Sequence, residues 1–262
     1  MLLASCYHNP TPVKSVLSND QNVVYFKGTA VGADGNAIVL SARLTKPVGS
    51  GSFPALVLLH GCGGIQPKRD HQWAERLSGG GYVTLQIDSF SPRGISNTCT
   101  YSGHDLDNLL QKRVIDAYDA QRYLATLPFV DKSRIAVMGW SQGGSTTLHA
   151  LHREKENPFR AAIAFYPSCR RLLANRKVPL LILIGESDDW TPASRCADMI
   201  QKENTSSEVI LKVYPGAFHG FDTLGANSNI RGSRGMHHIQ YDAEADADSI
   251  TRVKDFWETH LR

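Results

Sequence analysis

The sequence lacks the long apolar runs and the basic clusters that mark two large classes of protein. No stretch of 18 or more apolar residues occurs in the 262 residues, so a membrane-spanning helix is not expected. Lys and Arg number 28 against 25 Asp and Glu, and no basic run is longer than Arg170 and Arg171. Binding to nucleic acid or to an anionic membrane requires a more concentrated positive charge. Neither kind of partner is therefore predicted.

Recognisable metal-binding motifs are also missing. His149 and His152 lie three residues apart on an expected helix, but a third ligand and the H-E-x-x-H pattern are absent. His237 and His238 likewise have no partner nearby in the sequence. We therefore predict neither a metal site nor a cofactor.

The composition is that of a folded globular protein. With 42% hydrophobic and 20% charged residues, 22 glycines and 12 prolines, the chain is too apolar to be disordered and too mixed to be fibrous. Its length suits one large α/β domain, which we expect to span residues 22–262. No oligomeric state is predicted.

Residues 1–21 are expected to form an N-terminal extension. Residues 1–6, MLLASC, resemble the end of a bacterial lipoprotein signal, in which small residues precede a cysteine that becomes lipid-modified. Cys6 is therefore a candidate lipid anchor, and a frayed terminus is the alternative interpretation.

The number of cysteines is odd. The five lie at positions 6, 62, 99, 169 and 196. One anchor cysteine with two disulfides would account for this number, and so would five unrelated thiols in a reducing cytosol.

Short apolar runs without alternation recur along the chain, and such runs are typical of strands buried on both faces. Amphipathic helices are expected between them, the clearest at 105–127, which Pro128 ends. Strands separated by helices imply a mostly parallel sheet with helices on both faces. The expected strands are 55–60, 82–87, 134–140, 161–165, 180–185 and 208–214, after an opening hairpin of 22–28 and 37–44; the other helices are 70–77, 142–152, 192–202 and 247–261; residues 222–241 form the longest expected loop.

Ser141 stands at a predicted junction between a strand and a helix. The sequence there is Gly-Trp-Ser-Gln-Gly over residues 139–143, a G-x-S-x-G pattern in the context of a nucleophile elbow. Such a sharp turn strains the serine backbone, and the flanking glycines accommodate the close approach of neighbouring segments. The pattern predicts that Ser141 is a nucleophile.

A serine nucleophile needs a base, and the base needs an orienting carboxylate. Asp188 and His219 follow successive predicted strands, in the order expected of an α/β-hydrolase. A helix N-cap is the alternative role for Ser141, and a structural role is the alternative for His219. Asp188 and Asp189 suit a turn as well. Of the two, Asp188 is favoured, because Asp189 is next to Trp190 and nearer the following helix.

A glycine-rich segment follows the strand 55–60 and supplies candidate donors for an oxyanion hole. The backbone N–H groups of Cys62 and Gln142 are the expected pair. A phosphate-binding loop is the alternative, but residues 60–64, HGCGG, match neither G-x-G-x-x-G nor a Walker motif.

With these residues assembled, the chain resembles the dienelactone hydrolase family of the α/β-hydrolase superfamily from about Ala30 to its C-terminus. Three stretches carry the resemblance besides the triad: QIDSFSPRG at 86–94, VDKSRIAVMGWS at 130–141 and GESDDWTP at 185–192. The resemblance implies an α/β-hydrolase fold and a cofactor-free hydrolase for small-molecule ester or lactone substrates. The name-giving enzymes use a cysteine nucleophile, whereas this chain has Ser141, so a more general carboxylesterase is favoured.

The resemblance also suggests how the cysteines pair. Four cysteines besides Cys6 allow three pairings. In the superfamily topology the strands before Cys62 and Cys99 are neighbours, and Cys169 and Cys196 are similarly placed. We therefore expect the disulfides Cys62–Cys99 and Cys169–Cys196. They would locate the protein outside the cytoplasm, in the periplasm or as a lipoprotein, with a cytoplasmic location as the alternative.

Substrate selection is expected to come from residues that flank the strand ends. An arginine at the mouth of the site would suit an anionic ester, and solvent exposure is the alternative for each arginine. A serine peptidase or acyltransferase with the same triad, or a non-catalytic binding protein, is the rival functional hypothesis. The candidate pocket residues are Arg93, Trp140, Tyr166, Arg170, Arg171 and Trp190.

Overall fold

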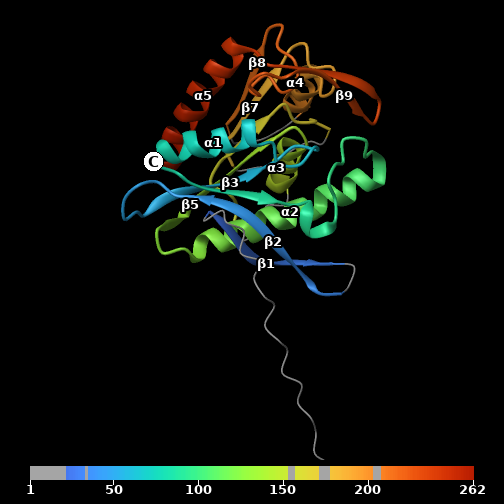
Figure 1. The fold of residues 1–262 in the computed structure, drawn as a ribbon. Helices are drawn as coiled ribbons and strands as arrows, with labels where there is room; N and C mark the ends of the chain where they lie inside the picture. The colour runs from blue at the N-terminus through green and yellow to red at the C-terminus, as the bar shows by residue number, and fades with distance from the viewer. Residues whose placement is uncertain (1–21, 33–34, 153–156, 171–177, 203–207) are drawn as a thin grey trace, which may run out of the picture.

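The structure is a computed structural model that describes residues 22–32, 35–152, 157–170, 178–202 and 208–262. Its centre is an eight-stranded sheet with the strand order β1-β2-β4-β3-β5-β6-β7-β8 (Figure 1). The candidate anchor Cys6 and the rest of the expected extension lie outside the described residues. The strands are β1 (Val23–Val31), β2 (Ala37–Thr45), β3 (Phe53–Leu59), β4 (Val83–Asp88), β5 (Val130–Trp140), β6 (Ala162–Phe165), β7 (Leu180–Gly185) and β8 (Val209–Tyr214).

The sheet is mostly parallel, as the sequence predicts. β2 runs antiparallel to both β1 and β4, and the pairs from β4 through β8 are parallel. Central strands are covered on both faces: every residue of β7 is buried, as are Pro54 to Leu59 of β3. The opening strands β1 and β2 form the predicted hairpin, and their burial tends to alternate because only one of their faces is covered.

The helices lie on both faces of the sheet. Gly139 of β5 packs against Gly143 of α3, whereas the next residue, Trp140, packs against Trp73 of α1. Successive strand residues point to opposite faces, so α1 and α3 cover opposite faces. α5 lies beside α1, where Arg262 donates to the carbonyl oxygen of Gly80. The helices are α1 (Pro67–Gly79), α2 (Gly103–Thr126), α3 (Gln142–His152), α4 (Ala193–Lys202) and α5 (Ala243–Leu261).

Three helices begin earlier than predicted: α2 by two residues, and α1 and α5 by three and four residues. α1 starts at Pro67, a residue favoured in the first turn, although the residues up to 69 show no apolar periodicity. α5 starts at Ala243 because Asp242 caps it: the Asp242 carboxylate accepts hydrogen bonds from the N–H groups of Glu244 and Ala245. None of the described helices is long and apolar enough to cross a membrane.

The prediction that residues 222–241 form a loop is wrong in its central part. This segment contains an antiparallel hairpin of β9 (Asn227–Gly232) and β10 (Gly235–Gln240). β9 is polar and mostly exposed, so it lacks the apolar alternation by which strands are identified. The hairpin is attached beside His219, whose carbonyl oxygen accepts a hydrogen bond from Gln240 N–H.

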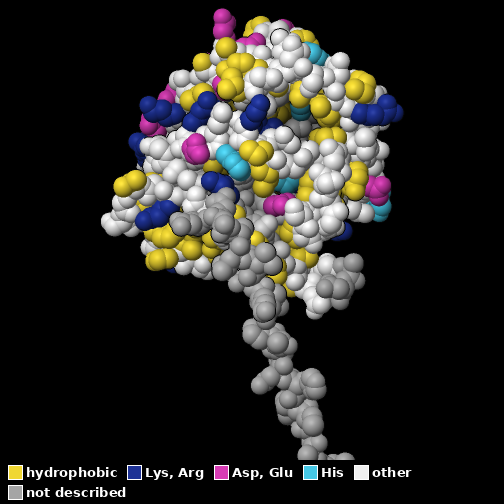
Figure 2. Space-filling view, in the orientation of Figure 1, with side chains coloured by type: hydrophobic (Ala, Val, Ile, Leu, Met, Phe, Trp, Pro, Cys, Tyr) yellow, Lys and Arg dark blue, Asp and Glu magenta, His cyan; other side chains and the backbone are white. Residues whose placement is uncertain are grey.

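Charged side chains of both signs are spread over the surface. On the face shown in Figure 2, Lys and Arg side chains are scattered among acidic and uncharged ones. The largest exposed apolar side chains include Tyr25, Val31 and Val39, which lie on the outer hairpin of the sheet.

Candidate active site

Ser141 occupies a sharp turn between β5 and α3. Its φ angle is +53°, in the left-handed region that side chains rarely adopt. Neighbouring backbone leaves no room for side chains beside it. A Cβ on Gly143 would lie 2.0 Å from the carbonyl oxygen of Leu59, and one on Gly139 would lie 2.3 Å from that of Gly143. The glycines of the motif thus permit the close contact of β3, β5 and α3 that forces the turn.

The structure brings together the three residues predicted as a triad. The distance from His219 Nε2 to Ser141 Oγ is 2.9 Å, and the distance from His219 Nδ1 to Asp188 Oδ2 is 2.7 Å. His219 and Asp188 are buried, whereas Ser141 is partly exposed. The hydroxyl, the imidazole and the carboxylate therefore form a continuous chain of hydrogen bonds that ends at a solvent-accessible oxygen.

The Asp188 carboxylate is held in place by its own loop. Its Oδ1 accepts hydrogen bonds from the N–H groups of Trp190 and Thr191, and its Oδ2 accepts one from Thr191 Oγ1 at 2.8 Å. Burial alone would raise the pKa of Asp188, but the nearby His219 and these hydrogen bonds hold the pKa below its ordinary value. Asp189, the alternative candidate, instead faces His237 Nδ1 at 3.3 Å.

The segments expected to form the oxyanion hole lie beside the serine. The N–H of Gln142 begins α3 and so has no acceptor within the helix. A Cβ on Gly61 would lie 3.7 Å from Ser141 Cβ, which brings the loop of Cys62 close to the serine. The donor roles of Cys62 and Gln142 stay a prediction.

Both expected disulfides are formed in the structure. Cys62–Cys99 links the loop after β3 to the segment before α2, and Cys169–Cys196 links the segment after β6 to α4. The first bridge also lines the cavity at Ser141. The cysteines thus tie together the loops around the candidate site.

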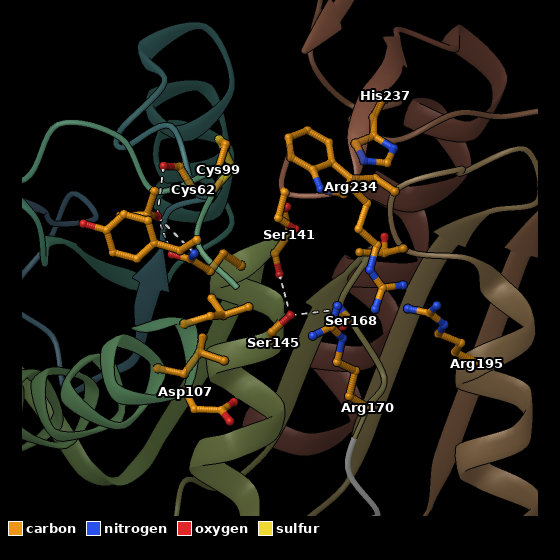
Figure 3. A pocket seen from close by; sticks show the side chains of 18 of the residues that line it. Cys62, Cys99, Asp107, Ser141, Ser145, Ser168, Arg170, Arg195, Arg234 and His237 are labelled. Atoms are coloured by element: carbon orange, nitrogen blue, oxygen red, sulfur yellow. Dashed lines mark hydrogen bonds between the residues drawn. A yellow bond between two sulfur atoms is a disulfide. The ribbon is translucent and has the colours of Figure 1, made fainter. Parts of the chain in front are cut away.

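A cavity of about 140 Å³ opens at Ser141. Figure 3 shows the Cys62–Cys99 bridge on one side of Ser141 and three arginines, Arg170, Arg195 and Arg234, on the other. The bridge side continues into Tyr101, which precedes α2, and into Leu106 and Leu110 of α2. One wall is therefore largely apolar, and the opposite wall is cationic.

No carboxylate forms an ion pair with the three arginines within the described residues. Partial burial, together with the positive charges of Arg234 and Arg195, lowers the pKa of Arg170. Asp107 is the nearby acidic group that opposes this effect. The cationic wall therefore carries more positive than negative charge.

Three of the predicted pocket residues do not line the cavity. Arg93 forms a two-point ion pair with the buried Asp116, and Trp140 and Tyr166 are fully buried, with their polar atoms turned to Asp222. Each sits near a strand end, as predicted, but points into the protein.

Trp190 and Arg170 do line the cavity, whereas Arg171 lies outside the described residues. The cavity lining also includes Arg195, Arg234 and His237, which were not predicted from the sequence. Their positions in the sequence gave a partial indication that they could lie near the site: Arg195 is in the helix that follows the Asp188 loop, and Arg234 and His237 are in the longest expected loop. Nothing in the sequence indicated that these segments converge.

Within the described ranges, no group of three or more His, Cys, Asp or Glu side chains could hold a metal ion. His149 lines the cavity, whereas His152 is exposed. His237 stacks on Trp190 with ring centroids 4.9 Å apart, and His238 faces Asn229.

Comparison with known proteins shows that the sequence and the fold of the chain are similar to those of known hydrolases. A family model described as the dienelactone hydrolase family matches residues 40–261. A dienelactone hydrolase-like promiscuous phosphotriesterase from metagenomic libraries is similar in structure, with a TM-score of 0.70, 22% identity, and coverage of 92% of this chain and 100% of that one. A thermophilic esterase of Thermogutta terrifontis has a TM-score of 0.66 at 17% identity, with coverage of 91% and 94%. The α/β-hydrolase fold predicted from the sequence is confirmed.

Sequence relatives match over a shorter region. A protein of Grosmannia clavigera named "Probable dipeptidyl-aminopeptidase B" is 35% identical over 92 residues, which are 33% of this chain and 9% of the relative. The chain therefore covers only a small part of that relative's length.

Proposed function

The chain belongs to the dienelactone hydrolase family, a family of hydrolases that act on ester bonds, and from this premise we propose that it is a serine carboxylesterase for small ester or lactone substrates. The observation that carries the proposal is the chain of hydrogen bonds from Ser141 through His219 to Asp188, with distances of 2.9 Å and 2.7 Å. Such a chain is the arrangement that activates a serine hydroxyl.

In the proposed reaction, His219 Nε2 takes the proton of Ser141 as Oγ attacks the ester carbonyl carbon. Asp188 holds the imidazole in the tautomer with Nδ1 protonated and stabilises the imidazolium. The tetrahedral oxyanion accepts hydrogen bonds from the N–H groups of Cys62 and Gln142, each contributing about 3 kcal/mol.

Collapse of this intermediate breaks the ester C–O bond, and His219 returns the proton to the leaving alkoxide. The acyl group is then attached to Ser141 Oγ. Water attacks the acyl carbon as His219 takes a proton from the water. The bond between the acyl carbon and Ser141 Oγ then breaks, His219 returns the proton to Oγ, and the carboxylic acid is released. No cofactor takes part in the proposed cycle.

The chemistry of the two cavity walls indicates which esters would fit the site. Its small volume favours a short acyl or alcohol group, and the apolar wall of Tyr101, Leu106 and Leu110 would receive it. The opposite wall of Arg170, Arg195 and Arg234 would attract an anionic group on the other side of the ester. We propose that small anionic esters are better substrates than neutral esters of the same size.

We also propose that the protein works outside the cytoplasm. The two disulfides link loops around the site and would be reduced by the thiol systems of the cytosol. Measurement of the free thiols of the protein from periplasmic and cytosolic extracts tests this: oxidation of the four cysteines only in the periplasmic material is the expected result.

Labelling with a fluorophosphonate tests the proposed nucleophile, since this reagent phosphonylates activated serines. We expect labelling and hydrolysis of p-nitrophenyl acetate by the wild-type protein and neither by Ser141→Ala. Ser145→Ala is the matched control, because Ser145 lines the same cavity, and this variant should still be labelled. Esterase activity retained in folded Ser141→Ala would reject the proposal. Faster cleavage of peptide anilides than of esters would favour a peptidase.

A further inference from the structure

Asp222 is a buried carboxylate that three side chains of distant segments contact. Its Oδ2 accepts hydrogen bonds from the indole N–H groups of Trp73 and Trp140, both at 2.8 Å. Its Oδ1 accepts one from the hydroxyl of Tyr166 at 2.6 Å. The side chain is 3% exposed. The proposed reaction cycle makes no use of this group.

Two of the three donors belong to the segments that position the candidate triad. Trp140 is the residue before Ser141, at the end of β5. Tyr166 follows β6, and its ring lies 4.5 Å from the imidazole ring of His219. Asp222 itself comes three residues after His219. The Asp222 carboxylate therefore links three parts of the candidate site: Trp140 next to the nucleophile, the Tyr166 ring next to His219, and the loop that carries His219.

Tyr166 extends this linkage to the orienting acid. Thr191 Oγ1 lies 3.1 Å from the carbonyl oxygen of Tyr166 and 2.8 Å from Asp188 Oδ2, so these two acceptors share the single proton of its hydroxyl. The backbone of Tyr166 has a φ angle of +35°, which a tyrosine rarely adopts, so the surrounding contacts must hold it there. The hydrogen bond from Tyr166 to Asp222 is one of these contacts.

The third donor differs from the other two. Trp73 lies on α1, a helix that carries none of the triad residues. It is as deeply buried as Trp140, with exposed fractions of 1% and 0%, and it donates to the same oxygen at the same distance. The two indoles therefore offer equivalent hydrogen bonds, one from outside the catalytic segments and one from within them.

We propose that Asp222 is a positioning residue that sets the distance between His219 Nε2 and Ser141 Oγ through Trp140 and Tyr166. The inference rests on the proposed function. A buried carboxylate with three donors has little freedom to move, because each lost hydrogen bond would leave a buried polar group without a partner. Attack by serine is sensitive to the placement of the base, and misplacement by about 1 Å can lower the rate by about 100-fold.

The test compares single losses of hydrogen bonds to the same carboxylate. Trp140→Phe and Tyr166→Phe each remove one donor next to the triad. Trp73→Phe is the matched control, since it removes the equivalent donor from α1. For each purified, folded variant we would measure the thermal midpoint, kcat and KM for p-nitrophenyl acetate, and the rate of fluorophosphonate labelling.

We expect Trp140→Phe and Tyr166→Phe to lower kcat and the labelling rate by about tenfold or more, with KM changed by less than about threefold. Trp73→Phe should lower the thermal midpoint about as much as Trp140→Phe but keep kcat within about threefold. In Asp222→Asn the amide still offers an oxygen to both indoles, so its kcat should lie between those of wild type and Asp222→Ala.

Two results would overturn the inference. The first is an unchanged kcat in both Trp140→Phe and Tyr166→Phe. The second is an equal loss of kcat in Trp73→Phe, which would show a general structural role for the carboxylate. Either result with an inactive Ser141→Ala leaves the proposed function intact. An active Ser141→Ala rejects the proposed function itself.

Discussion

Arg113 Nη1 donates a hydrogen bond to the side-chain Oε1 of Gln142 over 2.8 Å. Its Nη2 donates to the carbonyl oxygen of His60 over 2.6 Å. The guanidinium is fully buried, and burial lowers the pKa of Arg113 to about 10. It links the residue after Ser141 to the end of β3, and so connects the two segments that are proposed to donate to the oxyanion.

Replacement of Arg113 should therefore impair both stability and catalysis. Arg113→Met leaves the carbonyl oxygen of His60 without this charged donor, and we expect a loss of about 3 kcal/mol in the free energy of unfolding, together with a lower kcat. Arg122→Met is the control on the same helix. The Arg122 side chain is 57% exposed, and its buried partner Asp119 keeps the hydrogen bonds from Thr29 N–H and Oγ1, so the loss of Arg122 should cost about 0–1 kcal/mol. Urea unfolding measures the free energy of unfolding of each variant, and esterase assays measure its kcat. Equal losses of stability and kcat in the two variants would contradict the prediction.

The lowered pKa of Asp188 predicts a stability contribution that disappears in acid. Since its pKa is lower in the folded than in the unfolded state, the ionised carboxylate stabilises the fold fully above its ordinary pKa of about 3.9. The contribution is lost as the pH falls through the folded-state pKa. Urea unfolding of wild type and Asp188→Asn between about pH 6 and pH 3 should therefore show a shrinking difference in stability. A stability difference between wild type and Asp188→Asn that grows toward low pH would contradict the prediction.

The two disulfides should differ in their effect on catalysis. They join residues 37 and 27 apart in sequence, and loss of either should cost about 3–4 kcal/mol of stability. Only Cys62 lies in a segment proposed to bind the oxyanion. The double variant Cys62→Ser/Cys99→Ser should therefore lose kcat as well as stability, whereas Cys169→Ser/Cys196→Ser should lose mainly stability. The stability of the two double variants is measured by guanidinium unfolding, and their kcat at a temperature where both are folded. A lower kcat in Cys169→Ser/Cys196→Ser than in Cys62→Ser/Cys99→Ser would count against the oxyanion assignment.

The cationic wall should make ester preference depend on salt. Monoethyl succinate carries a carboxylate where ethyl butyrate has a methyl group, so the ratio of their kcat/KM values isolates the charge. We expect this ratio to fall with added NaCl, and to fall about threefold or more in Arg234→Gln. Arg231→Gln is the control on the same hairpin, because Arg231 is exposed and does not line the cavity. A ratio that responds equally to both substitutions would point to net charge alone.

The strands, the sheet type, and the turn at Ser141 between a strand and a helix could be predicted because local patterns determine them. A strand buried on both faces needs a continuous apolar run, and β3 and β7 have one. The turn at Ser141 requires glycine at 139 and 143, because backbone fills the space that side chains would need. These constraints act within a few residues of the chain and are visible in the sequence.

The roles of buried charged residues could not be predicted in the same way. Arg113 and Asp116 lie on the helix 103–126, where charged residues are expected to face solvent, yet both are buried with partners on other segments. Asp222 was likewise part of an expected loop. A partner that is distant in sequence leaves no local pattern, so the misassignment of Arg93 as a pocket residue has the same physical origin.

The hairpin of β9 and β10 closes on itself: the N–H of Tyr241 donates to the carbonyl oxygen of Ala226 across its base. The chain therefore enters and leaves the hairpin at neighbouring points. The outer part of the hairpin can be exchanged without changing the path of the remaining backbone. Segments of other lengths, grafted between residues 228 and 237, would remodel the rim that carries Arg234. The graft must spare Ile239 and Gln240, since these residues pair with the backbone of His219.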